Sequence, residues 1–246
     1  MKLIQREQYL EKIINVMGTP DIKVITGVRR SGKSKLLEAF KAHIQKCNAN
    51  ANIIHINFNL PEYDALNEYK ALYDYVNSNY QDGKENFVLI DEVQMCNDFE
   101  KAINGLHATE KYDIYITGSN AYLLSGELAT LLSGRYIQID MLPFSFKEYY
   151  EATKESGKNK REIFDSYLKY GSFPYVSYLE NNERVINQYI EGIYNTILLK
   201  DVATREKIND VSVLENILKI VASSIGSPIS TKKISDTLIS SGRKIS

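Results

Sequence analysis

Short apolar segments alternate with longer amphipathic segments over roughly the first 140 residues of the chain. Four of the short segments are rich in β-branched residues, and they cover residues 22–26, 52–58, 87–91 and 113–117. A fifth, residues 136–140, alternates between apolar and polar positions, which is typical of a strand at a sheet edge. Continuous apolar runs of this length indicate strands that are buried on both faces, as in a parallel sheet.

Helical spacing marks the segments between these strands. Residues 33–47 place Leu36, Leu37, Phe40 and Ile44 on one face, and residues 98–107 form another such segment. Strands that alternate with helices in this way imply right-handed crossovers and a sheet covered on both faces. The pattern therefore predicts an α/β fold, with a five-stranded parallel sheet flanked by helices.

The pattern changes after Pro143, because no further strand is predicted. Helical spacing continues in residues 144–153, 161–171, 183–206 and 211–226. A polar loop at 155–160 and a Gly/Pro break at 170–176 separate these helices. We therefore expect three parts: an α/β domain over residues 1–142, a helical part over 143–210 and a further helical part over 211–246.

Composition and charge exclude several classes of protein. The 246 residues are 43% hydrophobic and 25% charged, which is an ordinary globular balance, and the net charge of −1 gives no global attraction to nucleic acid or membrane. No apolar run reaches the roughly 18 residues that a membrane span needs, and the N-terminus lacks a secretory pattern. Cys47 and Cys96 match no metal spacing. These features predict a cytoplasmic protein with reduced thiols and no membrane contact.

A glycine-rich segment directly follows the first predicted strand and precedes the helix at 33–47. It reads GVRRSGKS and comprises Gly27, Val28, Arg29, Arg30, Ser31, Gly32, Lys33 and Ser34. Glycines allow successive backbone N–H groups to turn towards an anion, and a helix N-terminus adds positive potential. In such a loop Lys33 reaches the β- and γ-phosphates and the Ser34 hydroxyl ligates Mg²⁺. Lys35 is included among the predicted nucleotide-binding residues.

An acidic pair ends the apolar segment 87–91. Asp91 at the strand end is predicted to hold the Mg²⁺ shell, and Glu92 is predicted to act as general base towards the attacking water. The alternative is an ordinary strand end with two solvated acids. ATP and Mg²⁺ are the predicted cofactors, since no guanine-reading motif is present.

Polar residues also end the segment 113–117. Thr117 and Ser119 are candidates to contact the γ-phosphate or the attacking water, while the alternative is a turn in which Ser119 or Asn120 caps the next helix. Arg135 precedes the last predicted strand, where its guanidinium could reach a phosphate of its own or a neighbouring subunit. The alternative for Arg135 is a solvated or structural role.

Together these motifs resemble the AAA+ ATPases, and within them the prokaryotic and archaeal-type ATPase family. The matching segments are GVRRSGKS, IDEVQMCNDFEKAINGL, and ITGSN followed by LLSGR and LPFSFKEYY. The resemblance implies that Arg135 is a γ-phosphate or subunit-interface arginine. It also implies that Arg6 and Tyr9 belong to an N-terminal helix lying over the adenine base.

The same resemblance implies a helical lid over residues 143–210 and a winged helix from residue 211, which we expect to be cut off at Ser246. A mild basic excess from Thr231 onward is compatible with DNA contact, with a solvated face or with packing.

We therefore expect an Mg²⁺-dependent ATPase that acts as a molecular switch on DNA or a protein partner, with a homo-oligomer as a further expectation. A nucleotide-gated DNA-binding regulator with little turnover is the first alternative. A small-molecule kinase is the second.

Overall fold

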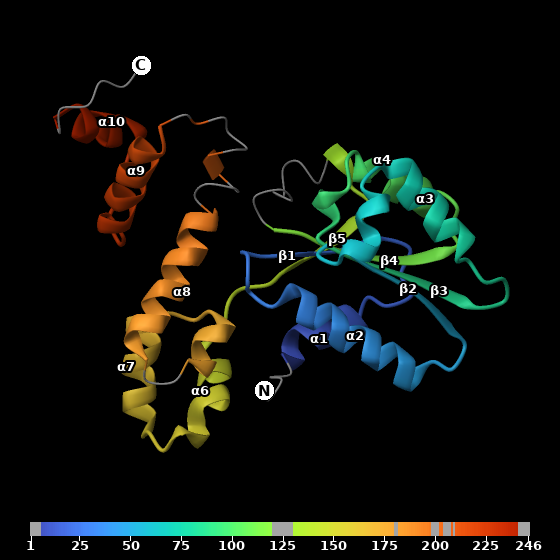
Figure 1. Ribbon diagram of the computed structural model, residues 1–246, viewed down its shortest axis with the longest axis horizontal. Coiled ribbons are helices and arrows are strands. Elements are labelled where there is room, and N and C mark those ends of the chain that lie inside the picture. The colour runs from blue at the N-terminus through green and yellow to red at the C-terminus, as the bar shows by residue number, and fades with distance from the viewer. Residues whose placement is uncertain are drawn as a thin grey trace. The chain divides into compact units, whose positions relative to one another are not determined.

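The computed structural model describes residues 6–119, 130–179, 182–197, 202–203, 208 and 210–240 (Figure 1). The chain forms two compact units, Met1–Ile186 and Asn187–Ser246. The boundary between the units falls within helix α8, Glu183–Thr196.

A five-stranded parallel sheet forms the centre of the first unit. Its strands are β1 Ile22–Thr26, β2 Ala51–Asn57, β3 Glu85–Asp91, β4 Tyr112–Thr117 and β5 Tyr136–Asp140, and their order is β2-β3-β4-β1-β5. Every neighbouring pair is parallel. The predicted α/β fold, its five strands and the position of the fifth strand at an edge are confirmed.

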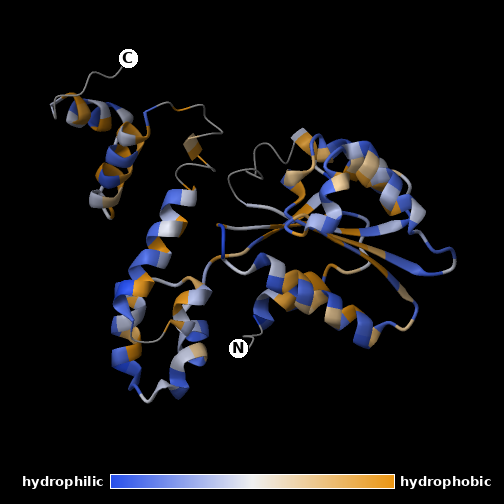
Figure 2. Ribbon diagram, viewed as in Figure 1, coloured by the Kyte–Doolittle hydropathy of each residue, from blue (hydrophilic) through white to orange (hydrophobic). Residues whose placement is uncertain are grey.

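Helices cover both faces of the sheet. Figure 1 shows α1 (Glu7–Ile14) and α2 (Lys33–Cys47) on one side, and α3 (Tyr69–Ser78) and α4 (Phe99–His107) on the other. Alternate residues of β3 explain this arrangement, since Phe87 and Leu89 pack in the cluster with α1 and α2 while Val88 and Ile90 pack in the cluster with α3 and α4. Figure 2 shows hydrophobic segments along the strands, and residues 87–90 of β3 are all apolar.

The sheet direction determines where polar loops meet. All five strands are parallel, so their last residues Thr26, Asp91 and Thr117 lie at the same edge of the sheet, the one formed by the carboxyl ends of the strands. Two short 3₁₀ helices lie between the main elements, at Pro61–Leu66 after β2 and at Val93–Met95 after β3. β4 lies between β1 and β3. This strand order is the one that Thr117 and Ser119, at and just after the end of β4, need for the predicted contact with the γ-phosphate or the attacking water.

Helices α6 (Phe146–Thr153) and α7 (Lys160–Tyr170) complete the first unit, with 3₁₀ turns at Lys154–Ser156 and Pro174–Tyr178. Both helices begin with a capping box, in which Ser145 pairs with Glu148 and Asn159 pairs with Glu162. Each box satisfies backbone N–H groups that a helix start would otherwise leave without acceptors.

The second unit contains the end of α8 and two further helices. α9 spans Val211–Ser223 and is capped by Asp210, and α10 spans Thr231–Ser240. The predicted helix 183–206 is described as α8 only to Thr196, and much of residues 198–209, like Arg243 and Lys244, lies outside the described residues. The partial winged helix and the domain boundaries stay predictions. No helix among the described residues is long and apolar enough to cross a membrane.

Candidate functional site

The loop between β1 and α2 is closed by the chain that follows β5. Met141 donates its backbone N–H to the Thr26 carbonyl at 2.8 Å, which brings the Met141 carbonyl over Gly27. A Cβ at Gly27 would lie only 2.3 Å from that carbonyl oxygen, and the φ of Gly27 is 153°. Both observations require glycine at this position, so the first glycine of the motif is fixed by packing as well as by backbone conformation.

The second glycine begins α2. Gly32 has a φ of 105° and occupies the N-cap position, where no side chain caps the helix. Lys33 is 3% exposed, and its Nζ donates to the carbonyl oxygens of Gly27 and Val28 at 3.1 and 3.2 Å. An ammonium group and an uncapped helix N-terminus therefore meet at one loop, and this combination suits an anion.

Ser31 is fully buried within the loop. Its Oγ has no hydrogen-bond partner among the described residues, while its backbone N–H donates to the Val28 carbonyl at 3.2 Å. Ser34 is half-buried in the first turn of α2. A buried hydroxyl without a partner is costly, and a phosphate oxygen would satisfy it.

Asp91 is the buried carboxylate at the end of β3, with 1% exposure. Its Oδ1 accepts the Thr117 hydroxyl at 2.5 Å, while Oδ2 is buried without a partner in the described part of the chain. The Thr117 oxygen in turn accepts the backbone N–H of Glu92 at 3.0 Å. A single hydroxyl from β4 thus holds the Asp91 carboxylate and the backbone of Glu92.

Glu92 adopts a strained backbone conformation. Its φ of 57° and ψ of 49° lie in the left-handed region, which is unusual for a non-glycine residue. Its Oε2 accepts a hydrogen bond from Nε2 of Gln94, and Oε1 of Gln94 is buried without a partner among the residues described. The turn therefore places the Glu92 side chain half-buried at the sheet edge, held from one side by Gln94.

Ser119 follows β4 at the same edge. The Gly118 backbone N–H donates to the Ile25 carbonyl at 3.2 Å, which holds this segment beside β1. Ser119 is 1% exposed, and its Oγ is another buried polar atom without a partner in the described ranges. The alternative cap at Asn120 lies outside the described residues.

These residues fit a magnesium–nucleotide complex. Mg²⁺ in such sites usually takes one or two carboxylates or hydroxyls from the protein and fills its shell with phosphate oxygens and water. Asp91 provides the buried carboxylate oxygen and Ser34 would provide the hydroxyl. No cluster of three or more His, Cys, Asp or Glu that could hold a metal occurs among the described residues.

Contacts within the protein hold the Arg6 side chain. Its guanidinium is buried, hydrogen-bonded to the Ser31 carbonyl at 3.1 Å and to the Glu148 carboxylate, and enclosed between the rings of Tyr9 and Phe144 at 4.5 and 5.3 Å. Tyr9 is buried as well, and its hydroxyl accepts the Leu142 backbone N–H. These internal contacts occupy both side chains, and their predicted position over the adenine stays a prediction.

Two further predicted residues lie away from the loop. Lys35 is exposed and its Nζ pairs with Glu38 at 2.6 Å, so its ammonium group is not brought into the loop with Lys33. Arg135 is exposed and precedes Tyr136, which pairs with Ile22 at the opposite end of β1. Five residues of strand separate it from the loop by about 16 Å. Arg135 therefore cannot contact a phosphate in its own loop, and only the neighbouring-subunit role stays a prediction.

Three further residues, none of them predicted as a site residue from the sequence, hold parts of the site in place. Gln94 holds Glu92, the Met141 carbonyl fixes Gly27, and Glu148 binds Arg6. The Ser145–Glu148 spacing is a recognisable capping-box pattern, so a sequence signal for Glu148 as a helix-start residue was present. Its pairing with Arg6, 142 positions earlier in the chain, has no local signal.

The geometry defines a class of protein before any relative is considered. A parallel sheet with an anion-binding loop after β1 and a buried aspartate at the end of β3 is a P-loop NTPase fold. Residues 19–150 match the AAA domain family, and the chain belongs to that family. Residues 161–246 match a domain of unknown function.

Two curated relatives are similar to this chain over nearly its whole length. An uncharacterized protein of Haemophilus influenzae is 38% identical over 242 residues, covering 97% of this chain and 60% of the relative. The uncharacterized protein MJ1544 of Methanocaldococcus jannaschii is 27% identical over 265 residues, covering 100% of this chain and 56% of the relative. The chain thus spans less than two thirds of the length of either relative.

A solved structure has the same fold. The Walker-type ATPase of Pyrococcus abyssi superposes with a TM-score of 0.59 at 16% identity, covering 99% of this chain and 86% of that chain. At this identity the likeness supports the fold alone.

Proposed function

We propose that this chain is an Mg²⁺-dependent ATPase that binds ATP at residues 27–34 and uses hydrolysis to switch a DNA or protein partner. The observation that carries the proposal is the double hydrogen bond of Thr117, which positions the buried Asp91 and the adjacent Glu92 at the edge of the sheet where the phosphate loop lies.

Each residue has a distinct part in the proposed reaction. The loop N–H groups and Lys33 bind the phosphates, and Ser34 and Asp91 hold the metal, which would neutralise charge on the phosphate oxygens. Glu92 takes a proton from water while the water oxygen bonds to the γ-phosphorus and the bond to the β-phosphate oxygen breaks. The products are ADP and inorganic phosphate.

Three features support hydrolysis over transfer to another acceptor. Glu92 directly follows the metal-binding aspartate, which a kinase that excludes water does not need. Ser119 and Ser31 add buried hydroxyls without partners among the described residues, and both suit phosphate or water contacts. The family match to an AAA domain covers this whole site.

The regulator with little turnover is a second candidate, and the Gln94–Glu92 contact favours it. This hydrogen bond occupies an oxygen of the proposed base. If the contact persists with nucleotide bound, the chain would hold ATP without cleaving it. The DNA or protein partner and the homo-oligomer are parts of the proposal that rest on the resemblance, and the cytoplasmic location rests on the composition and the N-terminal sequence.

The test compares wild type with Glu92→Gln and Lys33→Ala. We expect wild type to bind MgATP and to release phosphate in steady state. Glu92→Gln should bind equally well but hydrolyse about 10²-fold or more slowly, and Lys33→Ala should lose binding. Glu11→Gln, at an exposed position of α1, is the matched control and should behave as wild type.

Other outcomes separate the candidates. Binding without phosphate release by wild type would favour the regulator. Phosphate transfer to a small acceptor would favour the kinase. Absence of binding in folded wild type would contradict the proposal altogether.

A further inference from the structure

Arg6 uses all five of its N–H donors within the protein. Nε donates to Glu148 Oε1 at 2.7 Å, and one terminal nitrogen donates to the carbonyls of Ser31 at 3.1 Å and Leu142 at 2.7 Å. The other terminal nitrogen donates to the Pro143 carbonyl at 3.2 Å and to Glu148 Oε2 at 3.0 Å. A guanidinium has five N–H donors, so its hydrogen-bonding capacity is filled.

These contacts join three separate segments of the fold. Ser31 belongs to the phosphate loop, Leu142 and Pro143 to the connection after β5, and Glu148 to the first turn of α6. Arg6 itself immediately precedes α1. One side chain near the N-terminus therefore contacts both the nucleotide loop and the first helix of the segment that follows the sheet.

The Arg6–Glu148 pair is specific as well as buried. The two side chains are 6% and 14% exposed, and the carboxylate accepts two parallel hydrogen bonds. Burial would raise the pKa of Glu148, but hydrogen bonds from Arg6 and Ser145 outweigh this effect and lower the pKa below its ordinary value. The carboxylate is thus held charged, and the planar guanidinium fixes its orientation.

The bond to Ser31 also orients a donor of the phosphate loop. The described peptide bonds include no cis bond, so the Ser31 carbonyl and the Gly32 N–H point in opposite directions across one planar unit. When Arg6 holds the carbonyl on its own side, the Gly32 N–H is turned away from Arg6. Gly32 begins α2, and its N–H is among the loop amides that an anion would use.

We infer that Arg6 is a positioning residue that couples nucleotide in the phosphate loop to helix α6, by holding the Ser31–Gly32 peptide and Glu148 at the same time. This inference rests on the proposed nucleotide binding and extends it. A bound nucleotide that stabilises the orientation of the Ser31–Gly32 peptide also stabilises the Arg6–Glu148 pair. Because coupling is reciprocal, an intact first turn of α6 raises the affinity for nucleotide.

The experiment compares wild type with Arg6→Lys and Glu148→Gln. Lysine keeps the charge but has three donors on a flexible stem, so it cannot reproduce the fork to Glu148 together with the carbonyl contacts. Glutamine keeps the size of Glu148 and removes its charge. Arg161→Lys is the matched control, because Arg161 is exposed in the first turn of α7. MgATP affinity and hydrogen exchange of the α6 amides, with and without MgATP, are measured on folded protein.

We expect wild type to slow exchange in both α2 and α6 when MgATP binds. In Arg6→Lys the affinity should fall about tenfold, within the usual range of coupling energies, and the bound nucleotide should still protect α2 but no longer protect α6. Glu148→Gln should show the same selective loss, and the double variant should be no weaker than Arg6→Lys. A residue that merely stabilised the fold would change exchange equally with and without nucleotide.

The contrary results are distinct. If wild type binds MgATP and Arg6→Lys retains both affinity and nucleotide-dependent α6 protection, the coupling role is wrong while the nucleotide site stands. If bound MgATP leaves α6 exchange unchanged in wild type, the coupling role is also wrong. If folded wild type binds no MgATP, the proposed function fails and the coupling role fails with it.

Discussion

The Thr117 hydroxyl donates to Oδ1 of Asp91 at 2.5 Å, across the pairing of β4 with β3. Its oxygen also accepts the backbone N–H of Glu92, so one neutral side chain of β4 holds both the Asp91 carboxylate at the end of β3 and the backbone of the residue that follows it. This arrangement leaves Oδ2 of Asp91 as the carboxylate oxygen without a partner in the described part of the chain. The polar end of β4 is therefore part of the acidic site and does not merely adjoin it.

Replacing Thr117 by Val tests this relationship. Valine keeps the shape, but it leaves Asp91 Oδ1 and the Glu92 N–H without their partner, so the free energy of unfolding should fall by about 1–3 kcal/mol. The turnover rate for ATP should fall roughly 10²-fold, because the base and the metal-binding acid lose their alignment. Denaturant titration and phosphate release measure the two effects. Thr117→Ser keeps the hydroxyl and should retain most of the stability and most of the turnover rate. Equal losses in Thr117→Val and Thr117→Ser would instead show that the methyl group contributes more than the hydroxyl.

Gly27→Ala is expected to abolish nucleotide binding. The new Cβ would lie 2.3 Å from the Met141 carbonyl oxygen, so either the loop or the segment after β5 that carries Met141 must move. Isothermal titration with MgATP, together with a thermal melt, measures the outcome. Gly192→Ala is the matched control, because a Cβ there meets nothing within 4 Å and the residue lies inside α8. The control should be neutral or stabilising by up to about 1 kcal/mol. Wild-type affinity in Gly27→Ala would contradict the described packing.

Gln94→Met tests the contact that holds the proposed base. Methionine has a similar length but cannot donate to Glu92, and a hydrogen bond to a charged group is worth about 1.5–3 kcal/mol. If the contact orients Glu92 for water, the turnover rate should fall roughly tenfold with unchanged MgATP affinity. A rise in turnover would instead identify the contact as a restraint on the base and favour the regulator with little turnover. Single-turnover phosphate release, compared with Glu92→Gln, separates the two.

The strands could be predicted because each lies within a hydrophobic layer. β1 is buried at all five positions and β3 at six of seven, so their apolar runs have nearly the observed bounds. Helix α3 was not predicted. It buries Leu72 and Val76 among polar and tyrosine residues, and its tyrosines Tyr69, Tyr73 and Tyr75 pack half-buried on the core. Tyrosine suits both a surface and a core, so its spacing gives a weak helical signal.

The site could be predicted only where its residues are close together in the sequence. The loop after β1 and the acids after β3 are local patterns, and the structure brings them to one sheet edge because the strands are parallel. The positions of the Arg6 and Arg135 side chains were harder to predict, because the surroundings of a long charged side chain depend on tertiary contacts. The pairing of Arg6 with Glu148 depends on how the connection after β5 crosses the loop, and no sequence period encodes that crossing.

Arg135 is expected to act on a neighbouring subunit if it acts on phosphate at all. Its position at the opposite end of β1 excludes its own loop. Arg135→Ala and Lys33→Ala should each lose hydrolysis alone, yet an equimolar mixture should recover activity. In a symmetric dimer with random exchange, roughly a quarter of the sites would combine an intact loop with an intact arginine. Phosphate release by the mixture, at concentrations where the chain associates, measures this. A mixture as inactive as its components would contradict the role in trans.

The Arg6–Glu148 pair should make stability depend on acid pH in a defined direction. Glu148 has a pKa below its ordinary value of 4.5, because hydrogen bonds from Arg6 and Ser145 outweigh the opposing effect of burial. A carboxylate with a lowered pKa contributes stability that is present above the unfolded value and is lost as pH falls through the folded value. Wild type should therefore melt higher than Glu148→Gln near neutral pH, and the difference should shrink between about pH 5 and pH 3. Thermal melts across this range measure the difference.

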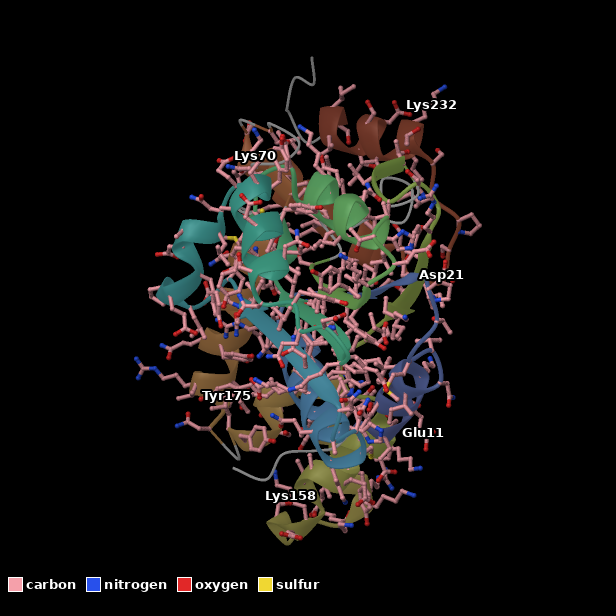
Figure 3. All side chains as sticks on the ribbon, turned by 90° about the vertical axis from the view of Figure 1, so that its right-hand side faces the viewer. Glu11, Asp21, Lys70, Lys158, Tyr175 and Lys232 are labelled. Atoms are coloured by element: carbon pink, nitrogen blue, oxygen red, sulfur yellow. The ribbon has the colours of Figure 1, made fainter. Side chains whose placement is uncertain are left out.

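Glu11→Gln, at the exposed position labelled in Figure 3, should stay close to wild type throughout. A difference between wild type and Glu148→Gln that does not change with pH would mean that the charge of Glu148 contributes nothing to the pair.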